Sequence, residues 1–202
     1  MQAQSEHTQY DILLSIVIVT WNAEGEIEAC LNSIIKYNKD IPLEIIVIDN
    51  ASKDKTKDIL KNFSVQTDFI KVILNDDNKG FTAANNQGIK IAQGDFVLLL
   101  NPDTKVTENS LVKLIEQLAV SGTMGAIAPQ LLNEDHTIQP SCRTFPRYWD
   151  MFCELTLLSK IFPMSKIFAR WKMNYFNHNE IDEVEQPMAA ALMIKKNVMD
   201  KV

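Results

Sequence analysis

The sequence predicts an α/β protein with a mostly parallel central sheet and helices on both of its faces. Two observations predict this fold. Segments typical of strands alternate with segments typical of helices, and the strand-like segments are apolar at consecutive positions. Consecutive apolar residues indicate strands that are buried on both faces, as in parallel sheets. Because parallel strands need a right-handed crossover between them, the helices must return over the sheet and cover it.

The predicted strands are short apolar runs that end at polar or turn-forming residues. The first two are rich in β-branched side chains, which favour strands. The fourth lies between Gly94 and Pro102, and it stops there because proline cannot donate to a sheet ladder. In chain order the predicted strands are residues 13–19, 43–48, 69–74 and 96–100.

The predicted helices carry apolar residues at intervals of three and four, so each presents one apolar stripe to the core. Ile27, Leu31 and Ile34 form this stripe in the first helix, and Ser52 is a candidate N-cap of the second. In chain order the predicted helices are residues 24–37, a segment through Ile59, Leu60 and Phe63, residues 81–92 and residues 111–120.

A short strand at residues 125–128 and a hairpin around residues 133–136 are expected after the fourth helix. His136 has two interpretations, a catalytic base or a turn residue. Histidine tolerates the left-handed backbone of a tight turn, and we favour the turn. The chain thus divides into a polar extension (1–12), an α/β domain (13–130) and a further portion (131–202).

Residues 145–176 are rich in aromatic and basic side chains. Such a segment can lie on an anionic membrane surface, or it can pack as a small helical layer on the core. Pro163 interrupts any long amphipathic helix, so we favour packing.

Composition excludes several classes of function. The 202 residues carry 20 basic and 26 acidic side chains without a basic stripe, so nucleic acid is not an expected partner. The three cysteines lack metal-ligand spacing and do not form an even disulfide set, which favours a reducing, cytoplasmic location. No signal peptide or spanning segment is evident, and no G-x-G-x-x-G motif follows a strand, which disfavours a Rossmann dehydrogenase.

Polar residues follow each of the four predicted strands, and a parallel sheet would bring them to one edge, where open α/β sheets bind ligands. Asp103 follows the fourth strand, and a carboxylate there suits a divalent cation that bridges phosphate oxygens. Alternatively, Asp103 only caps the next helix. Asp49 can accept a hydrogen bond from the imide N–H of uracil or thymine. Gly80 allows close backbone approach, and Asn85 can bond a sugar or phosphate oxygen.

Four motifs in this order carry a family resemblance: residues 15–22, 47–56, 78–85 and 98–104. The chain resembles the family 2 inverting glycosyltransferases of the GT-A fold, and most of all their rhamnosyltransferase-like branch. The resemblance implies transfer of a sugar, with inversion, from a UDP- or dTDP-linked donor to a glycan or lipid-linked acceptor in cell-surface polysaccharide synthesis. It also implies a Mg²⁺ or Mn²⁺ cofactor, and it is compatible with peripheral contact at the inner face of the membrane.

The resemblance also implies roles for individual residues. Thr20 and Asn22 would line the nucleotide pocket, and Asp49 would read the base. Asp103 matches the metal-binding aspartate at the end of the family's Asp-x-Asp element. Asn101 replaces the first aspartate of that element in this chain, and a neutral amide attracts the cation less than a carboxylate does. The further residues expected to bind the nucleotide sugar are Asn50, Ser52, Asp54, Asn78, Gly80, Phe81, Asn85 and Asn101.

The last part of the chain resembles the acceptor side of the family's site. Residues 184–195 match the segment that closes this side, and residues 197–202 look like the approach to the family's acidic catalytic element. The catalytic base is therefore expected beyond Val202, and an inactive nucleotide-sugar-binding or interaction domain is the alternative function. A nucleotidyltransferase is disfavoured, because residues 20–24 are not a glycine-rich basic loop.

Overall fold

The computed structural model describes residues 13–38, 41–199 and 201, so the polar extension predicted for residues 1–12 lies outside them. The chain forms two compact units. The first runs up to Ile127 and resumes at Ala190, and the second comprises Ala128–Ala189.

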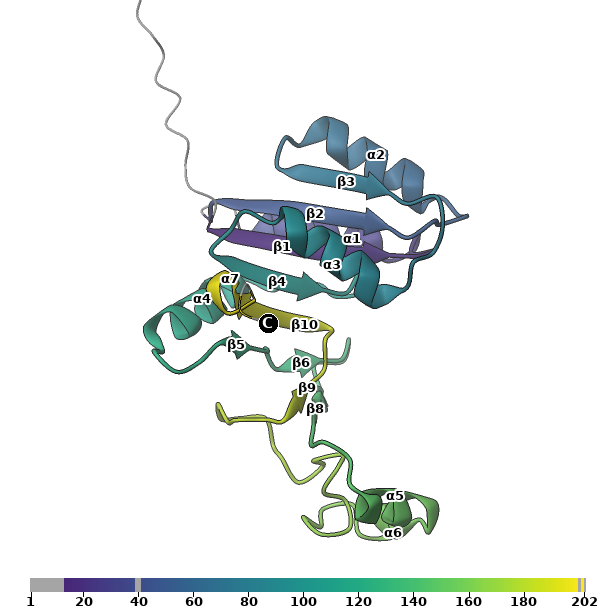
Figure 1. Ribbon diagram of the computed structural model, residues 1–202, viewed down its shortest axis with the longest axis vertical. Helices are drawn as coiled ribbons and strands as arrows, with labels where there is room; N and C mark the ends of the chain where they lie inside the picture. The colour runs from purple at the N-terminus through teal and green to yellow at the C-terminus, as the bar shows by residue number, and fades with distance from the viewer. Residues whose placement is uncertain (1–12, 39–40, 200, 202) are drawn as a thin grey trace, which may run out of the picture. The chain divides into compact units, whose positions relative to one another are not determined.

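The first unit is built on a six-stranded sheet in the order β3-β2-β1-β4-β10-β5 (Figure 1). The strands β1, β2, β3 and β4 run parallel to one another, whereas β10 is antiparallel to its neighbours β4 and β5. This confirms the predicted mostly parallel sheet. The strands are β1 (Leu14–Thr20), β2 (Leu43–Asp49), β3 (Ile70–Leu74), β4 (Phe96–Leu100), β5 (Ala126–Ile127) and β10 (Ala191–Lys195).

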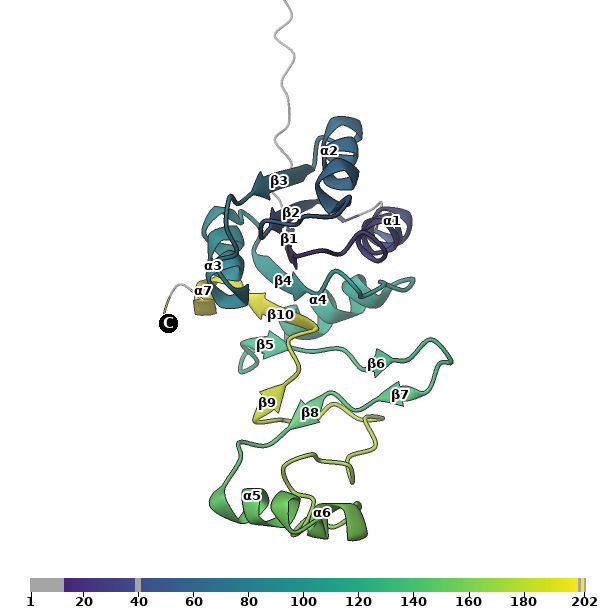
Figure 2. The same ribbon diagram turned by 90° about the vertical axis from the view of Figure 1, so that its right-hand side faces the viewer.

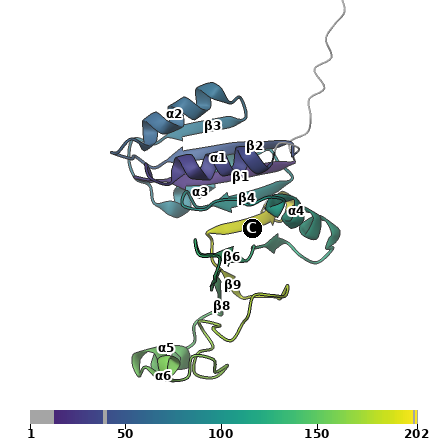
Figure 3. The ribbon, with the colours of Figure 1, turned by 180° about the vertical axis from the view of Figure 1, so that it is seen from behind.

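Helices cover both faces of this sheet, as predicted. Figures 2 and 3 show α1, α2 and α4 on one face and α3 on the opposite face. The helices of this unit are α1 (Ile27–Tyr37), α2 (Thr56–Gln66), α3 (Phe81–Ile91), α4 (Ser110–Val120) and α7 (Lys196–Met199). The prediction of Ser52 as the N-cap of α2 is wrong, because the helix begins only at Thr56, whose N–H donates to Asp54 Oδ1 at 3.1 Å.

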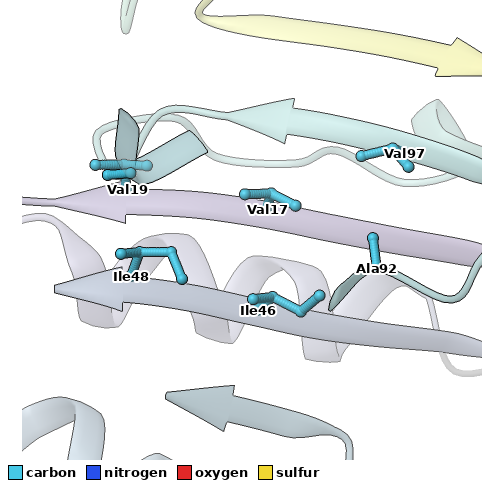
Figure 4. Packing of buried hydrophobic residues seen from close by; sticks show 7 residues of the cluster. Val17, Val19, Ile46, Ile48, Ala92 and Val97 are labelled. Atoms are coloured by element: carbon cyan, nitrogen blue, oxygen red, sulfur yellow. The ribbon is translucent and has the colours of Figure 1, made fainter. Parts of the chain in front are cut away.

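The strand register builds the core beneath α3. Val17 lies opposite Ile46 and Val19 opposite Ile48, so these side chains share one face of the sheet (Figure 4). Helix α3 packs closely on this face, since a Cβ added to Gly88 would lie 2.5 Å from Val17 Cγ1. A larger residue at this point would push the helix away from the sheet.

A polar cluster around the buried Glu44 lies at the amino-terminal ends of the parallel strands, which is the end opposite to the predicted ligand site. Ser15 Oγ donates to Glu44 Oε1 at 2.7 Å, and Lys71 Nζ lies 2.8 Å from Glu44 Oε2. The Gln93 N–H donates to the same carboxylate at 2.7 Å, and the Gly94 N–H donates to Ser15 Oγ at 2.8 Å. Burial raises the pKa of the Glu44 carboxyl, but the hydrogen bonds from Lys71, Ser15 and Gln93 outweigh it and leave the pKa below its ordinary value.

The second unit begins with the predicted hairpin. β6 (Leu131–Leu132) pairs antiparallel with β7 (Ile138–Gln139). His136 lies in the turn between them with φ of 64°, and its N–H donates to the Asn133 carbonyl at 3.0 Å. The structure thus confirms the interpretation of His136 as a turn residue.

The remaining elements of the second unit are two short strands and two helices, namely β8 (Cys142–Arg143), β9 (Gln186–Pro187), α5 (Tyr148–Leu155) and α6 (Leu158–Ile161). Helix α6 ends before Pro163, as predicted. Most large apolar side chains of residues 145–167 are exposed within this unit, because α5 turns Asp150 and Cys153 inward and its aromatic residues outward. Packing of residues 145–176 on the core stays a prediction. Among residues 13–38 and 41–199, no helix is long and apolar enough to cross a bilayer.

Candidate active site

The carboxyl ends of β1 and β2 place Thr20 and Asp49 side by side, as their pairing in the sheet register requires. Thr20 Oγ1 donates to Asp49 Oδ1 at 3.2 Å, and the Ser52 N–H donates to Asp49 Oδ2 at 3.0 Å. All three residues are buried. One oxygen of the Asp49 carboxylate therefore ties the end of β2 to the end of β1, and the other anchors the loop that follows β2.

Side-chain to backbone hydrogen bonds join the loop after β1 to the loop after β2. The Asn22 N–H donates to Ser52 Oγ, and the Lys53 N–H donates to Asn22 Oδ1, each at 2.8 Å. The Glu24 N–H donates to Asp54 Oδ2 at 3.1 Å. Desolvation opposes ionisation of Asp54, but its hydrogen bonds from Thr56 and Glu24 hold the pKa below its ordinary value. The two loops thus act as one rigid support.

The loop after β3 joins the same network through Asn50. Asn50 Nδ2 donates to Asn78 Oδ1 at 2.8 Å, and Asn50 Oδ1 accepts from the Lys79 N–H at 3.0 Å. Asn78 Oδ1 also accepts from the Gly80 N–H at 2.9 Å. Gly80 has φ of 82°, a left-handed conformation that favours glycine, and it leads directly into α3.

Two predicted binding residues lie in the first turns of α3. Asn85 is buried, and its Nδ2 donates to the Phe81 carbonyl at 3.0 Å, so part of its bonding capacity serves its own helix. The ring of Phe81 is 51% exposed at the helix start. Phe81 is therefore better placed than Asn85 to touch a ligand.

The loop after β4 carries the predicted metal ligand. Its backbone is held by the Asn101 N–H, which donates to the Ala190 carbonyl at 2.9 Å. Asp103 is exposed, and within the described residues its carboxylate accepts no hydrogen bond and forms no ion pair. The alternative that Asp103 caps the next helix does not hold, because α4 begins only at Ser110.

Cys30 of α1 lies beneath this loop, where its Sγ is 3.8 Å from the Asn101 carbonyl oxygen. Burial, with a smaller contribution from the negative charge of Asp103, raises the pKa of the Cys30 thiol to about 12. The thiol is therefore protonated at neutral pH, and it packs as a small apolar group under the site.

Around Asp103, the described part of the chain offers few side-chain ligands for a divalent cation. No group of three His, Cys, Asp or Glu side chains that could hold a metal occurs in the described part of the chain. Mg²⁺ commonly takes one or two carboxylates and completes its shell with water and phosphate oxygens. A single exposed carboxylate at the carboxyl edge fits that mode of binding, with the remaining ligands supplied by a diphosphate.

Burial divides the predicted binding residues into three groups. Thr20, Asp49, Asn50, Ser52 and Asn85 are buried and bond to other parts of the protein, so they form a scaffold. Asn22, Asn78, Gly80, Phe81 and Asp103 are exposed, and Asp54 and Asn101 lie between these extremes.

Sequence reasoning missed Trp21, whose side chain is 58% exposed next to Thr20 at the end of β1. A large exposed aromatic ring beside a polar ligand site suits stacking on a nucleobase. The signal was an aromatic residue directly after a buried strand.

A cavity of about 580 Å³ lies away from this edge. It opens beside Phe96, the first residue of β4, whereas the candidate site lies beyond the last residues of the parallel strands. The cavity is lined by Asp95, Phe96, Ala119, Lys195, Lys196 and Asn197. It does not contribute to the candidate site.

A family model described as "Glycosyl transferase family 2" matches residues 15–171. Among curated proteins, the chain is 30% identical to glycosyltransferase AglE of Haloferax volcanii over 111 residues, 54% of this chain and 36% of AglE. It is 32% identical to a poly-beta-1,6-N-acetyl-D-glucosamine synthase of Staphylococcus aureus over 125 residues, 60% of this chain and 29% of the synthase. The chain thus spans about a third of the length of these relatives.

Solved structures share the fold at lower identity. A mannosyltransferase from Pyrobaculum calidifontis, in complex with GDP-Man and Mn²⁺, matches with a TM-score of 0.54 and 22% identity, over 62% of this chain and 37% of that one. TarS of Staphylococcus aureus in complex with UDP-GlcNAc matches with a TM-score of 0.53 and 21% identity, over 87% of this chain and 57% of that one.

Proposed function

The chain belongs to glycosyl transferase family 2, and on that premise we propose that the carboxyl edge of its parallel strands binds the nucleotide-sugar donor of a glycosyl transfer. One observation carries this proposal. The loops after β1, β2 and β3 are joined by hydrogen bonds into one support, and the loop after β4 presents the free carboxylate of Asp103 at the same edge. A rigid polar edge with one available carboxylate suits a nucleoside diphosphate and a divalent cation.

For the donor, we propose a UDP- or dTDP-linked sugar. Asp49 would recognise the imide N–H of the pyrimidine through the capacity that its carboxylate keeps beyond the bonds to Thr20 and Ser52. The exposed ring of Trp21 would stack on the base. Asn22, which is exposed, would line the nucleotide pocket, while the buried Thr20, Asn50 and Ser52, together with Asp54, would shape its floor.

For the rest of the donor, we propose contacts from α3 and from the loop after β4. Asn78, Gly80, Phe81 and Asn85 would border the sugar and phosphates, and Asn101 would lie beside them. Mg²⁺ or Mn²⁺, held by Asp103 and the diphosphate, would neutralise charge on the leaving group. The chain's own residues bind and orient the donor, since fixed geometry and prearranged charge are what accelerate group transfer.

For the acceptor, we propose a glycan or lipid-linked sugar in cell-surface polysaccharide synthesis, with inversion at the anomeric carbon and a rhamnosyl- or hexosyl-type donor. The similarity to the poly-beta-1,6-N-acetyl-D-glucosamine synthase supports the polysaccharide. We place the reaction on the cytoplasmic side, which is consistent with free thiols at Cys30, Cys142 and Cys153.

The test is isothermal titration of the chain with UDP, dTDP and GDP, each with and without Mn²⁺. We expect binding of UDP or dTDP that strengthens with Mn²⁺, and we expect Asp103→Ala to lose this Mn²⁺ effect. Asp68→Ala is the matched control, because Asp68 is also exposed but lies before β3, at the other end of that strand. A folded chain that binds none of the three nucleotides would overturn the proposal.

A further inference from the structure

Helix α5 buries a charged side chain and exposes most of its apolar side chains, which is the reverse of the usual arrangement. Its inward residues are Asp150 and Cys153, which are both buried. Its apolar residues recur at helical spacing on the solvent side, where Tyr148 is 97% exposed and Leu155 is 85% exposed. A water-exposed helix normally places such a stripe against a core, so this one is available for another apolar phase.

Aromatic rings extend this stripe into a continuous surface. Trp149 stacks on Phe152 with ring centroids 5.4 Å apart, and Phe162 lies 5.3 Å from Phe168. The Trp149 ring also lies 6.3 Å from that of Phe168, which links the two pairs. Figure 2 shows α5 and α6, which carry or flank these rings, next to each other. We call this surface the aromatic patch; it comprises Tyr148, Trp149, Met151, Phe152, Leu155 and Phe162, all of them exposed.

Three exposed basic residues lie in or beside the segment that carries the aromatic patch, and one exposed acidic residue, Glu185, accepts from the Phe145 N–H at 2.6 Å at the start of this segment. Both acidic residues of α5 are neutralised inside the unit, since Asp150 Oδ2 lies 2.6 Å from Arg170 Nη2 and Glu154 Oε2 lies 2.5 Å from Lys172 Nζ. Arg147, Lys160 and Lys166 are exposed near the patch. The chain as a whole carries a net charge of −6, so this positive border is a local feature.

We propose that the aromatic patch binds the surface of an anionic lipid bilayer. Tyr and Trp side chains suit the region between headgroups and acyl chains, because each has an apolar body and a polar group. The three cations match the negative headgroups, which attract basic residues close to the surface. A neutral apolar protein partner would gain nothing from this border of positive charge.

The experiment is flotation of the full chain with vesicles of phosphatidylcholine alone and of phosphatidylcholine with phosphatidylglycerol. We expect binding to the anionic vesicles only, and weaker binding as salt is raised. The double variant Tyr148→Ser/Leu155→Ser should bind at least about tenfold more weakly, since it removes two large apolar side chains from the contact. The control Val65→Ser/Val120→Ser removes side chains that are 85% and 88% exposed in the other unit, and it should bind normally.

The charge test uses Lys160→Gln/Lys166→Gln against Lys90→Gln/Lys113→Gln, which alters two exposed lysines of the first unit. Only the first pair should weaken vesicle binding, by about fivefold for each lysine. No binding of the folded chain to either vesicle, or equal loss in patch and control variants, overturns the proposal. Self-association that is lost in Tyr148→Ser/Leu155→Ser, without vesicle binding, would assign the patch to a second copy and also overturn it. Titration of the same variants with nucleotides shows whether the donor site still works, so a loss of vesicle binding can be told apart from a failure of the donor site.

Discussion

Asp49 offers the sharpest test of how the site is built, because two different substitutions separate its hydrogen bonds from its charge. Asp49→Ala removes the acceptors of the Ser52 N–H and the Thr20 hydroxyl, at 3.0 and 3.2 Å, in a fully buried position. Each buried polar group left without a partner costs about 1–3 kcal/mol. We therefore expect Asp49→Ala to lower the free energy of unfolding by about 3 kcal/mol.

Asp49→Asn keeps the shape and both hydrogen bonds, because the amide oxygen accepts from the Ser52 N–H while the amide nitrogen donates to Thr20 Oγ1. We expect it to cost less than about 1 kcal/mol. Urea unfolding followed by tryptophan fluorescence measures both values, and the corresponding fall in Tm for Asp49→Ala is about 6–12 °C.

An Asp49→Ala chain whose free energy of unfolding stays within about 1 kcal/mol of the parent would refute the scaffold role. Isothermal titration of the Asp49→Asn variant with UDP, dTDP and GDP then tests whether Asp49 recognises the nucleotide base. If the carboxylate reads the imide N–H, Asp49→Asn should lose the preference for UDP or dTDP over GDP while it remains folded. An unchanged preference would restrict Asp49 to the support of the loops.

Three further outcomes are expected. Gly88→Ala places a methyl group within contact of β1 and should destabilise the fold by about 1–3 kcal/mol in urea unfolding, whereas Gly25→Ala, which meets no atom within 4 Å, should not. The pKa of Glu44 is below its ordinary 4.5 in the folded protein, so Glu44 contributes stability above pH 4.5 that is lost as the pH falls through the folded-state pKa. Glu44→Gln should flatten this part of the pH dependence of unfolding, and an unchanged slope would contradict the assigned hydrogen bonds. Cys30, with a pKa of about 12, should resist iodoacetamide at about pH 8 in the native chain and react after denaturation, as mass spectrometry of its peptide can show.

Local patterns were sufficient to predict much of the first unit. The consecutive apolar residues of 96–100 specified β4 to the residue, and the apolar stripe of Ile27, Leu31 and Ile34 specified most of α1. Gly80 and the asparagines before it marked the turn into α3. These features depend on neighbours within a few residues, so composition and spacing contain the information.

Polar residues at successive strand ends also predicted where a site would lie, because parallel strands deliver their carboxyl ends to one edge. The sequence could not divide these residues by burial. Whether Asn50 faces a ligand or bonds to Asn78 depends on the position of a loop from a different part of the chain. The same limit explains the misplaced N-cap, since the partner of Ser52 Oγ is the backbone of Asn22.

The sequence by itself thus determined the four parallel strands, the four long helices of the first unit, the family resemblance and the edge at which the predicted site lies. Only the tertiary structure decided that β10 enters the sheet antiparallel between β4 and β5, and that α5 turns its apolar stripe to the solvent. Both results depend on pairings between residues far apart in the chain. The free energy of such contacts is fixed by packing and long-range hydrogen bonds, which a local pattern does not encode.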